Sequence, residues 1–292
     1  MNKTVGLIGV GIMGKLMISK WQEAGYTVFA MDNSEAAKAH CKENGVVVCE
    51  TKAELVEKTD KIVLCLPSPK ISIAVATELA EVAGENTIVM ETSTLSPDYA
   101  KEIKAIFDGS KGSFVEGCIL GRPSMIGKWT IIAGGDADKV AAMEDAMLQP
   151  GERVVHSGPV GTANAIKVLN NTMFCIFNAA VCEVFVAAEN AGVDHKAFYE
   201  IVANSQAATN SGVFREIAKK IVDGSYDQPN ATLDIAAKDN ACGKDLAKSV
   251  GLSLTMTNAA LAAFENAQTA GLGQLDSAAL YTYLRNVYPT IK

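Results

Sequence analysis

The chain has 292 residues, of which 49% are hydrophobic and 20% are charged. This composition excludes disorder as its main state, and the length fits about two globular domains. With 33 acidic against 26 basic residues, the formal charge is −7, so the chain has no basic field to attract nucleic acid or anionic lipid. We therefore expect neither nucleic acid nor a membrane among its partners.

Four further features bear on the cellular setting. The chain has no continuous apolar run of the roughly 18–20 residues that cross a bilayer, and its N-terminus lacks signal-peptide features. The seven cysteines are scattered through apolar segments, so we expect buried thiols. The three histidines stand apart from one another and from any cysteine pair, and we predict no metal site. The lack of a membrane-spanning run and of signal-peptide features predicts a cytoplasmic protein.

The first half of the chain alternates short β-branched runs with amphipathic segments. The predicted strands lie at 5–10, 28–31, 46–48, 62–66, 87–91 and 114–116, with further short ones at 129–133 and 153–155. The predicted helices lie at 15–24, 35–43, 52–58, 71–83 and 97–107. Apolar strands alternating with helices are typical of a parallel sheet covered on both faces. The predicted fold class is therefore α/β, with a doubly wound Rossmann-type sheet.

A glycine-rich segment follows the first predicted strand directly, with Gly9, Gly11 and Gly14 in the pattern G-x-G-x-x-G. The first glycine permits a tight turn, the second lets a pyrophosphate approach the backbone, and the third lets helix and strand pack closely. Ile12 and Met13 open the following helix, whose N-terminal N–H groups favour phosphate oxygens. The segment predicts a dinucleotide-binding loop.

Asp32 ends the second predicted strand, where a carboxylate accepts hydrogen bonds from the adenosine ribose hydroxyls and repels a 2′-phosphate. The next residues are Asn33 and Ser34, with no arginine nearby. We therefore predict NAD or NADH as the cofactor in preference to NADP. In the alternative interpretation the glycines only form a strand-to-helix turn, and Asp32 caps the next helix.

The second half of the chain differs in composition from the first. Residues 162–191 contain no Gly or Pro, which predicts one long, largely buried helix. Shorter helices are predicted at 195–203, 213–223, 232–250, 254–270 and 277–285, without a convincing strand. We predict an NAD-binding domain over 1–160, followed by an all-α domain over 161–292 that serves substrate and oligomer contacts.

Lys167 and Asn171 stand four residues apart near the start of the long helix, so both project from one face and can meet one small ligand. A lysine ammonium in a water-poor cleft can donate a proton to a carbonyl oxygen as hydride arrives, and an amine can take a proton from an alcohol. The alternative is a surface lysine whose ammonium reaches water.

At this point the chain resembles the β-hydroxyacid dehydrogenases, a family that includes 3-hydroxyisobutyrate dehydrogenase, tartronate semialdehyde reductase and sulfolactaldehyde reductase. The resemblance spans nearly the whole chain. It rests on the glycine loop at 9–14, Leu66-Pro67, Ser93-Thr94-x-x-Pro97, Gly134-Gly135, Lys167 with Asn171, Lys238-Asp239 and Asp276. It implies a Rossmann domain, a helical domain, an active site between them, and a homodimer or homotetramer.

The resemblance also implies a reaction and roles for particular residues. The reaction is hydride transfer between NAD and a short 3-hydroxy acid or its semialdehyde. Lys167 would be the catalytic acid or base, and Asn171 would position the substrate. The residues implied near the cofactor are Leu66, Pro67 and Thr94 at its nicotinamide half, and Lys238 near both cofactor and substrate.

The substrate loop departs from the family pattern. Residues 116–122 read Glu-Gly-Cys-Ile-Leu-Gly-Arg, where the family usually reads Asp-Ala-Pro-Val-Ser-Gly-Gly, and the loop is about two residues shorter before Gly127. Leu120 removes a serine hydroxyl, whereas Arg122 offers a planar fork for a carboxylate, sulfonate or phosphonate. We predict that Gly121 and Arg122 bind a small anionic aldehyde or hydroxy acid. Alternatively, Arg122 forms a salt bridge, and Glu116 is expected to have a structural role.

Two other functions stay open. The segment 116–127 is also similar to the corresponding loop of imine reductases, which share the two-domain layout but generally lack a lysine at the position of Lys167. An NAD(P)H-dependent imine reductase is therefore the first alternative. The second alternative is a protein without catalysis that binds NADH and senses the ratio of NADH to NAD.

Overall fold

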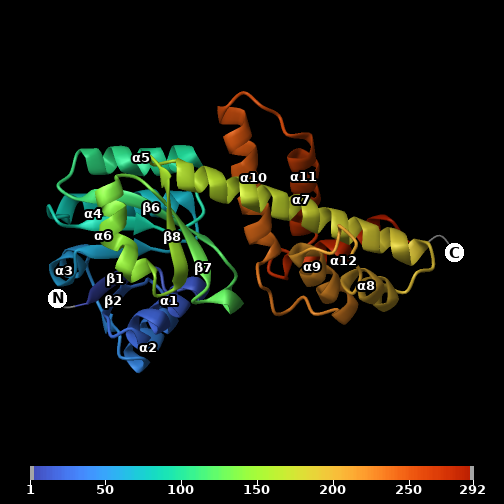
Figure 1. Ribbon diagram of the computed structural model, residues 1–292, viewed down its shortest axis with the longest axis horizontal. Helices are drawn as coiled ribbons and strands as arrows, with labels where there is room; N and C mark the ends of the chain where they lie inside the picture. The colour runs from blue at the N-terminus through green and yellow to red at the C-terminus, as the bar shows by residue number, and fades with distance from the viewer. Residues whose placement is uncertain (1–2, 290–292) are drawn as a thin grey trace. The chain divides into compact units, whose positions relative to one another are not determined.

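The computed structural model describes residues 3–289, and within these the N-terminal half is built on an eight-stranded sheet (Figure 1). The strands are β1 Thr4–Ile8, β2 Thr27–Met31, β3 Val47–Val48, β4 Lys61–Leu64, β5 Ile88–Glu91, β6 Ser113–Leu120, β7 Trp129–Gly134 and β8 Gly151–Gly158. Their order is β3-β2-β1-β4-β5-β6-β7-β8. The first six strands run parallel, β7 is antiparallel to β6, and β8 is parallel to β7.

Helices cover both faces of this sheet. On one face α1 (Ile12–Glu23), α2 (Glu35–Glu43) and α6 (Ala137–Met147) contribute to one buried apolar cluster. On the other face α3 (Lys52–Lys58), α4 (Pro69–Val82) and α5 (Pro97–Asp108) contribute to a second cluster. The strands supply both clusters by alternation: Val63 of β4 faces the first, and Ile62 and Leu64 face the second. The predicted doubly wound α/β sheet is confirmed.

The end of the sheet differs from the expectation in two ways. Helix α6 was not among the predicted helices, although Val140, Met143 and Met147 recur at helical spacing and are all buried. Strand β6 extends to Leu120, so most of the predicted substrate loop at 116–122 is strand that pairs with β7. Only the segment from Gly121 onward leaves the sheet, which corrects the expected loop boundary.

The C-terminal half is helical throughout its described residues. Its elements are α7 Thr162–Asn190, α8 His195–Ala203, α9 Gly212–Asp223, α10 Leu233–Ser249, α11 Thr255–Thr269, the 3-10 turn η2 Ser277–Ala279 and α12 Leu280–Val287. Phe185 of α7, Phe214 of α9 and Phe264 of α11 are buried in a common apolar core. The absence of a buried sheet explains why only a helical period is visible in this part of the sequence.

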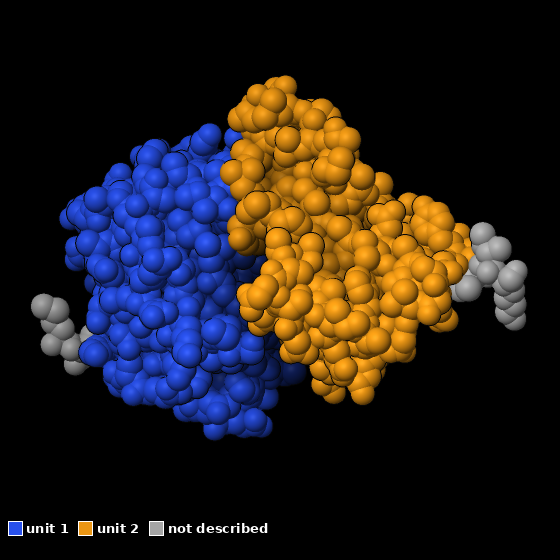
Figure 2. Space-filling model, turned by 45° about the vertical axis from the view of Figure 1, so that its right-hand side comes forward, with its two compact units in different colours: residues 1–167 blue, residues 168–292 orange. Residues whose placement is uncertain are grey.

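The chain divides into two compact units, residues 1–167 and 168–292, which are coloured separately in Figure 2. The division falls inside α7, one turn or more beyond the predicted boundary at residue 160. Helix α7 therefore begins in the first unit and continues through the second, and each unit has an apolar core of its own.

Helix α7 overturns the expectation that no segment is long and apolar enough to cross a bilayer. Of the described helices, it alone passes that test by length and composition. A core helix passes the same test, and Cys175, Cys182 and Phe185 of α7 are fully buried in the core of the second unit. An exposed apolar stripe also follows α7 at helical spacing, and it comprises Ile166, Leu169, Met173, Phe177 and Val184.

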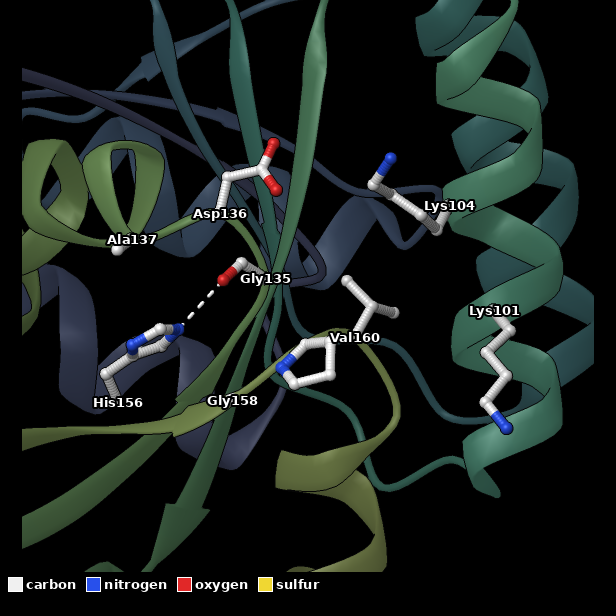
Figure 3. A pocket seen from close by; sticks show the side chains of 9 residues that line it. Lys101, Lys104, Gly135, Asp136, Ala137, His156, Gly158 and Val160 are labelled. Carbon is white, nitrogen blue, oxygen red and sulfur yellow. Dashed lines mark hydrogen bonds between the residues drawn. The ribbon is translucent and has the colours of Figure 1, made fainter.

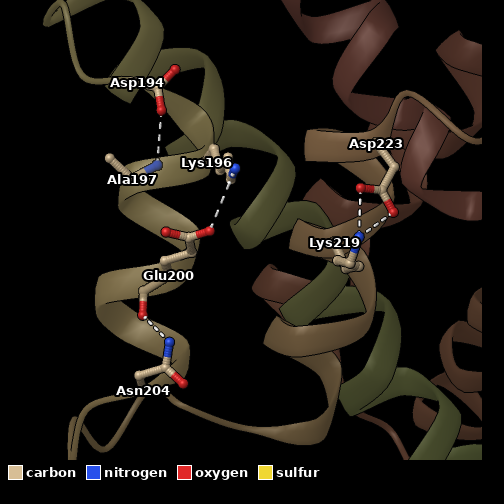
Figure 4. A network of polar contacts seen from close by, with 7 residues as sticks. All are labelled: Asp194, Lys196, Ala197, Glu200, Asn204, Lys219 and Asp223. Atoms are coloured by element: carbon tan, nitrogen blue, oxygen red, sulfur yellow. Dashed lines mark hydrogen bonds and ion pairs between the residues drawn. The ribbon is translucent and has the colours of Figure 1, made fainter.

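Polar contacts stabilise the ends of α8 and α9 (Figure 4). Asp194 caps α8 by accepting a hydrogen bond of 2.8 Å from the Ala197 N–H. In the last turn of α9 the Lys219 ammonium lies 2.5 Å from the Asp223 carboxylate. The Lys219–Asp223 ion pair is solvent-exposed, so it contributes at most about 1 kcal/mol, and both contacts have a local role.

Candidate active site

The glycine loop lies at the carboxyl end of β1, beside β4, where the strand order of the sheet reverses. Gly9 has φ of +101°, and a Cβ there would lie 2.1 Å from the Cys65 carbonyl oxygen. A Cβ on Gly14 would lie 2.3 Å from the Gly9 carbonyl oxygen. Both glycines are therefore required by the packing of the turn itself.

Gly11 is different, because a Cβ built on it meets nothing within 4 Å. It is the N-cap residue of α1, which begins at Ile12 and continues through Met13, and no side chain caps this helix end. The first N–H groups of α1 thus open onto the space next to Gly11. This open, electropositive helix end fits a pyrophosphate, and a dinucleotide would be held here by backbone N–H groups.

Asp32 follows β2 directly, and its carboxylate binds backbone N–H groups of the glycine loop and of the turn before α2. Its Oδ2 accepts a hydrogen bond of 2.7 Å from the Val10 N–H, and its Oδ1 accepts one of 2.8 Å from the Ser34 N–H. The contact with Ser34 lies close to the start of α2, where the alternative interpretation placed Asp32 as a cap. The N-cap residue of α2, however, is Ser34. Each carboxylate oxygen keeps lone pairs for a further donor, so the partly exposed Asp32 can still bind ribose hydroxyls.

The turns after β4 and β5 lie side by side. The Leu66 N–H donates a hydrogen bond of 2.7 Å to Ser93 Oγ, and the Ser93 N–H donates one of 2.8 Å to Glu91 Oε1. Since Gly9 packs against Cys65, the glycine loop lies next to the turn that follows β4. The structure thus brings Leu66, Pro67 and Thr94 to the carboxyl edge of the sheet near the glycine loop.

Glu91, the last residue of β5, is fully buried beneath these turns. Burial raises the pKa of its carboxyl, and hydrogen bonds from Ser93 offset part of the increase. Among the described residues, neither Glu91 Oε2 nor the nearby buried Ser72 Oγ has a hydrogen-bond partner within bonding distance. Burial is the largest cause, so it sets the direction of the change in pKa.

Lys167 lies in the second turn of α7 and is half-buried. Its charge acts on the thiol of Cys118 in β6, which places the ammonium near this strand. Burial is the main cause that raises the pKa of Cys118, so that thiol is a neutral neighbour. The start of α7 itself is held by the buried carboxylate of Glu116, whose structural role was the expected one.

Asn171 and Lys238 belong to the second unit, where Asp239 joins them. Asn171 Nδ2 donates a hydrogen bond of 2.7 Å to Asp239 Oδ2, and Lys238 Nζ lies 3.2 Å from Asp239 Oδ1. Asp239 is 9% exposed, so the carboxylate is buried with one amide and one ammonium as partners. The predicted residues on α7 and α10 are thus linked through a carboxylate to which sequence reasoning gave no role.

Gly121 and Arg122 begin the segment that leaves β6, and both residues are exposed. A Cβ on Gly121 would lie 2.1 Å from the Trp129 ring, and the Trp129 Nε1–H donates a hydrogen bond of 2.7 Å to the Arg122 carbonyl oxygen. The buried Trp129 therefore anchors the backbone of this segment. An anchored backbone with an exposed arginine can present a cation to an anion in solvent.

A separate cavity of about 560 Å³ lies elsewhere in the first unit (Figure 3). Its walls include Lys101 and Lys104 of α5 and His156 of β8, whose ring nitrogen lies 2.8 Å from the Gly135 carbonyl oxygen. The two ammonium groups are paired with Asp98 and Asp108 and point apart. This cavity contains none of the predicted site residues, so it is not the candidate active site.

Sequence reasoning missed three buried polar residues that hold the site together: Glu91, Asn164 and Asp239. Each stands in a segment that reads as apolar strand or helix, and polarity at a buried position was the available indication. No group of three or more His, Cys, Asp or Glu residues that could hold a metal ion exists among residues 3–289.

Comparison with known proteins covers both halves of the chain. The family model described as the NAD binding domain of 6-phosphogluconate dehydrogenase matches residues 4–158. The one described as NAD-binding of NADP-dependent 3-hydroxyisobutyrate dehydrogenase matches residues 161–284. The mitochondrial 3-hydroxyisobutyrate dehydrogenase of Mus musculus is 25% identical over 98% of this chain and 88% of its own.

Solved structures show the same architecture. A 3-hydroxyisobutyrate dehydrogenase from Salmonella typhimurium superposes with a TM-score of 0.86 at 24% identity, covering 96% of this chain and 99% of its own. An imine reductase from Pseudomonas sp. superposes with a TM-score of 0.63 at 24% identity, covering 97% of this chain and 100% of its own. At this identity both likenesses concern the fold.

Proposed function

The chain belongs to the 3-hydroxyisobutyrate dehydrogenase family of oxidoreductases, and we propose that it interconverts a short 3-hydroxy acid, or its sulfonate or phosphonate analogue, with the semialdehyde. The observation that carries the proposal is the pair Lys167 and Asn171, one helical turn apart on α7, with the Asn171 amide held by Asp239. A half-buried lysine beside an oriented amide suits proton transfer at a carbonyl or hydroxyl oxygen.

The proposed cofactor is NAD or NADH, bound by the glycine loop and Asp32. When bound, the nicotinamide accepts or supplies the hydride. The two hydrogen bonds that Asp32 accepts from Val10 and Ser34 hold its carboxylate at the end of β2, where it attracts ribose hydroxyls and repels a 2′-phosphate. Leu66, Pro67 and Thr94 are proposed to line the nicotinamide half.

Proton handling is assigned to Lys167. In the direction of reduction its ammonium donates a proton to the carbonyl oxygen, and in the direction of oxidation the amine takes a proton from the hydroxyl. Asn171 has a second amide N–H that can donate to the same oxygen, while its Oδ1 accepts a hydrogen bond of 3.2 Å from Asn170 Nδ2. Lys238, whose ammonium is paired with Asp239, adds positive charge beside Asn171.

The substrate's anionic group is proposed to bind at Gly121 and Arg122. The exposed guanidinium offers two parallel N–H groups for a carboxylate, sulfonate or phosphonate. Trp129 anchors the backbone next to it, which limits the freedom of the segment.

Steady-state NADH oxidation with aldehydes of equal length tests this function. The panel ends in carboxylate, sulfonate, phosphonate or an uncharged group, and each is measured with wild type, Arg122→Ala and the control Arg153→Ala, an exposed arginine on β8. We expect one anionic aldehyde to be preferred and to lose roughly 10- to 100-fold in kcat/KM in Arg122→Ala alone.

Other outcomes of that panel select other functions. Turnover of a cyclic imine, with no anionic aldehyde preferred, would favour imine reduction, to which the fold is also similar. Tight NADH binding without turnover of any compound would favour a sensor. Loss of activity in both arginine variants would remove the specific role of Arg122.

We further propose a homodimer or homotetramer in which the exposed apolar stripe of α7 is covered. Met173 and Phe177 are 53% and 51% exposed at the centre of this stripe. A reducing compartment such as the cytoplasm suits the seven cysteines, none of which forms a disulfide and six of which are buried. Sedimentation of wild type and of Met173→Glu with Phe177→Glu should show a larger assembly and a monomer, respectively.

A further inference from the structure

Glu116 lies in the middle of β6 with no exposed surface, and its carboxylate accepts hydrogen bonds from the first turn of α7. Oε2 accepts hydrogen bonds from the N–H groups of Gly161 at 2.7 Å and Ala163 at 3.4 Å. Oε1 accepts from the Asn164 backbone N–H at 3.2 Å and from Asn164 Nδ2 at 2.6 Å. The first helical turn is thus fastened to the sheet by one carboxylate, whose charge also suits a helix N-terminus.

Asn164 extends this contact to a second element. It is fully buried, and while Nδ2 binds Glu116, its Oδ1 accepts a hydrogen bond of 2.9 Å from the Leu95 N–H. The carboxylate can only accept and the Leu95 N–H can only donate, so the orientation of the amide is determined. Asn164 therefore connects α7 to the turn that contains Thr94.

The same turn is held from its other side by Glu91 through Ser93. Glu91 and Glu116 are paired in register on neighbouring strands, so two buried carboxyls support adjacent parts of the 92–95 turn. Lys167 follows Asn164 by three residues and shares its side of the helix. The position of the ammonium relative to Thr94 thus depends on a short chain of hydrogen bonds within one unit.

We propose that Glu116 and Asn164 are positioning residues for hydride transfer, because they set the first turn of α7, and with it Lys167, against the turn that carries Thr94. This inference rests on the proposed proton-transfer role of Lys167. Neither residue needs to touch substrate, since both act through backbone contacts of α7 and Leu95. A small displacement of Lys167 then costs rate even when substrate and cofactor still bind.

An exchange of the amide and the carboxylate tests the proposal. Glu116→Gln brings an NH2 group against the donors of α7, and Asn164→Asp puts a second carboxylate 2.6 Å from the first. In the double variant the amide and the carboxylate change places, and the contact with the Leu95 N–H is retained. We expect each single variant to lose about 10- to 100-fold in kcat with little change in KM for NADH. The double variant should recover part of this loss, because the side-chain pair is restored while a backbone N–H of α7 still faces the amide NH2 group.

Hydrogen exchange in the free protein supplies a readout without turnover. The Leu95 amide should exchange faster in Asn164→Leu, which keeps the size of the side chain but has no acceptor, and at the wild-type rate in the double variant. The matched control is Ser277→Ala, which removes the partner that Asn178 of the same helix binds at 2.9 Å. It should lower stability without lowering kcat by more than about twofold.

The outcomes separate this inference from the proposed function. If either single variant folds and leaves kcat unchanged, or if the double variant recovers stability but not kcat, the positioning role is wrong. If Lys167→Ala keeps full activity, the proposed function is wrong instead. Should a single variant fail to fold, Glu116→Asp keeps the charge, shortens its reach by one methylene, and is measured in the same way.

Discussion

The Asn171 side chain donates a hydrogen bond of 2.7 Å to Asp239, joining α7 to α10 within the second unit. Because a carboxylate only accepts, Asp239 determines which end of the Asn171 amide is the donor. The Lys238 ammonium lies 3.2 Å from the other oxygen of this buried carboxylate. An amide held in this way offers its remaining groups to a ligand with little freedom to rotate.

Asp239→Ala should therefore lower kcat/KM for the preferred aldehyde by about 10- to 100-fold, since the Asn171 amide loses its buried partner. The affinity for NADH should change much less. The control is Asp234→Ala, which removes another α10 carboxylate, one that accepts from Gln268 and Gln274 at 2.7 Å. Equal losses in the two variants would show that α10 packing, and not Asn171, is responsible.

Gly11 and Gly14 should respond differently to one added methyl group. Gly11→Ala meets no protein atom within 4 Å, so the melting temperature should hold while NADH binding weakens by at least about tenfold. Gly14→Ala forces a methyl group to 2.3 Å from the Gly9 carbonyl oxygen, so it should destabilise the fold. Fluorescence titration with NADH and thermal unfolding distinguish the two effects. Unchanged NADH affinity in Gly11→Ala would contradict the binding site.

Asp32 should confer a preference for NADH over NADPH, because its carboxylate repels a 2′-phosphate. We expect kcat/KM to favour NADH by roughly 100-fold or more in wild type. Asp32→Asn keeps one acceptor oxygen for the local turn and removes the charge, so the preference should fall. The ratio of the two kcat/KM values is the measurement. A wild-type preference for NADPH would exclude this assignment.

Glu91 should make stability depend on pH in an unusual direction. Its pKa is raised above the ordinary value of 4.5, so above that pH the native state holds a proton that the unfolded state has released. Stability from this group is therefore full below about 4.5 and is lost as pH rises toward the native pKa. Relative to Glu91→Gln, the wild-type melting temperature should fall as the pH rises above about 4.5. A constant difference would mean that Glu91 does not titrate in this range.

Lys167→Ala should lower turnover by roughly 10² to 10⁴ while NADH affinity stays nearly unchanged. The reason is that the proton step loses its donor, whereas the glycine loop and Asp32 are untouched. Lys101→Ala is a suitable control, because Lys101 is an exposed lysine of the same unit. Burst kinetics with excess NADH separate chemistry from product release. Undiminished turnover would remove Lys167 from the mechanism.

The sequence predicted the sheet because strands such as β4 and β5 are buried on both faces and leave continuous apolar runs. It missed α6, whose Ala-rich and acidic sequence resembles a surface loop. The helical spacing of the buried Val140, Met143 and Met147 was the pattern that could have predicted it. It also ended β6 too early, because the pairing with β7 that extends this strand is antiparallel and depends on residues further along the chain.

The candidate site divides in the same way. The glycine loop and Asp32 were predictable, since spacing along one βαβ unit determines where they lie. The contacts from Glu116 to Asn164 and from Asn171 to Asp239 span 48 and 68 residues, and neither is visible in local pattern. Only the packing of α7 on its neighbours shows that these polar residues are buried and paired.

Helix α7 has a mechanical consequence for the proposed chemistry. Residues 162–190 form one α-helix without Gly or Pro, and the division between the two units falls immediately after Lys167. Lys167 and Asn171 therefore belong to different units but to the same rigid turn of helix. The spacing between the proposed proton donor and the proposed positioning amide is therefore set by the pitch of one helix, about 5.4 Å per turn, and not by any contact between side chains.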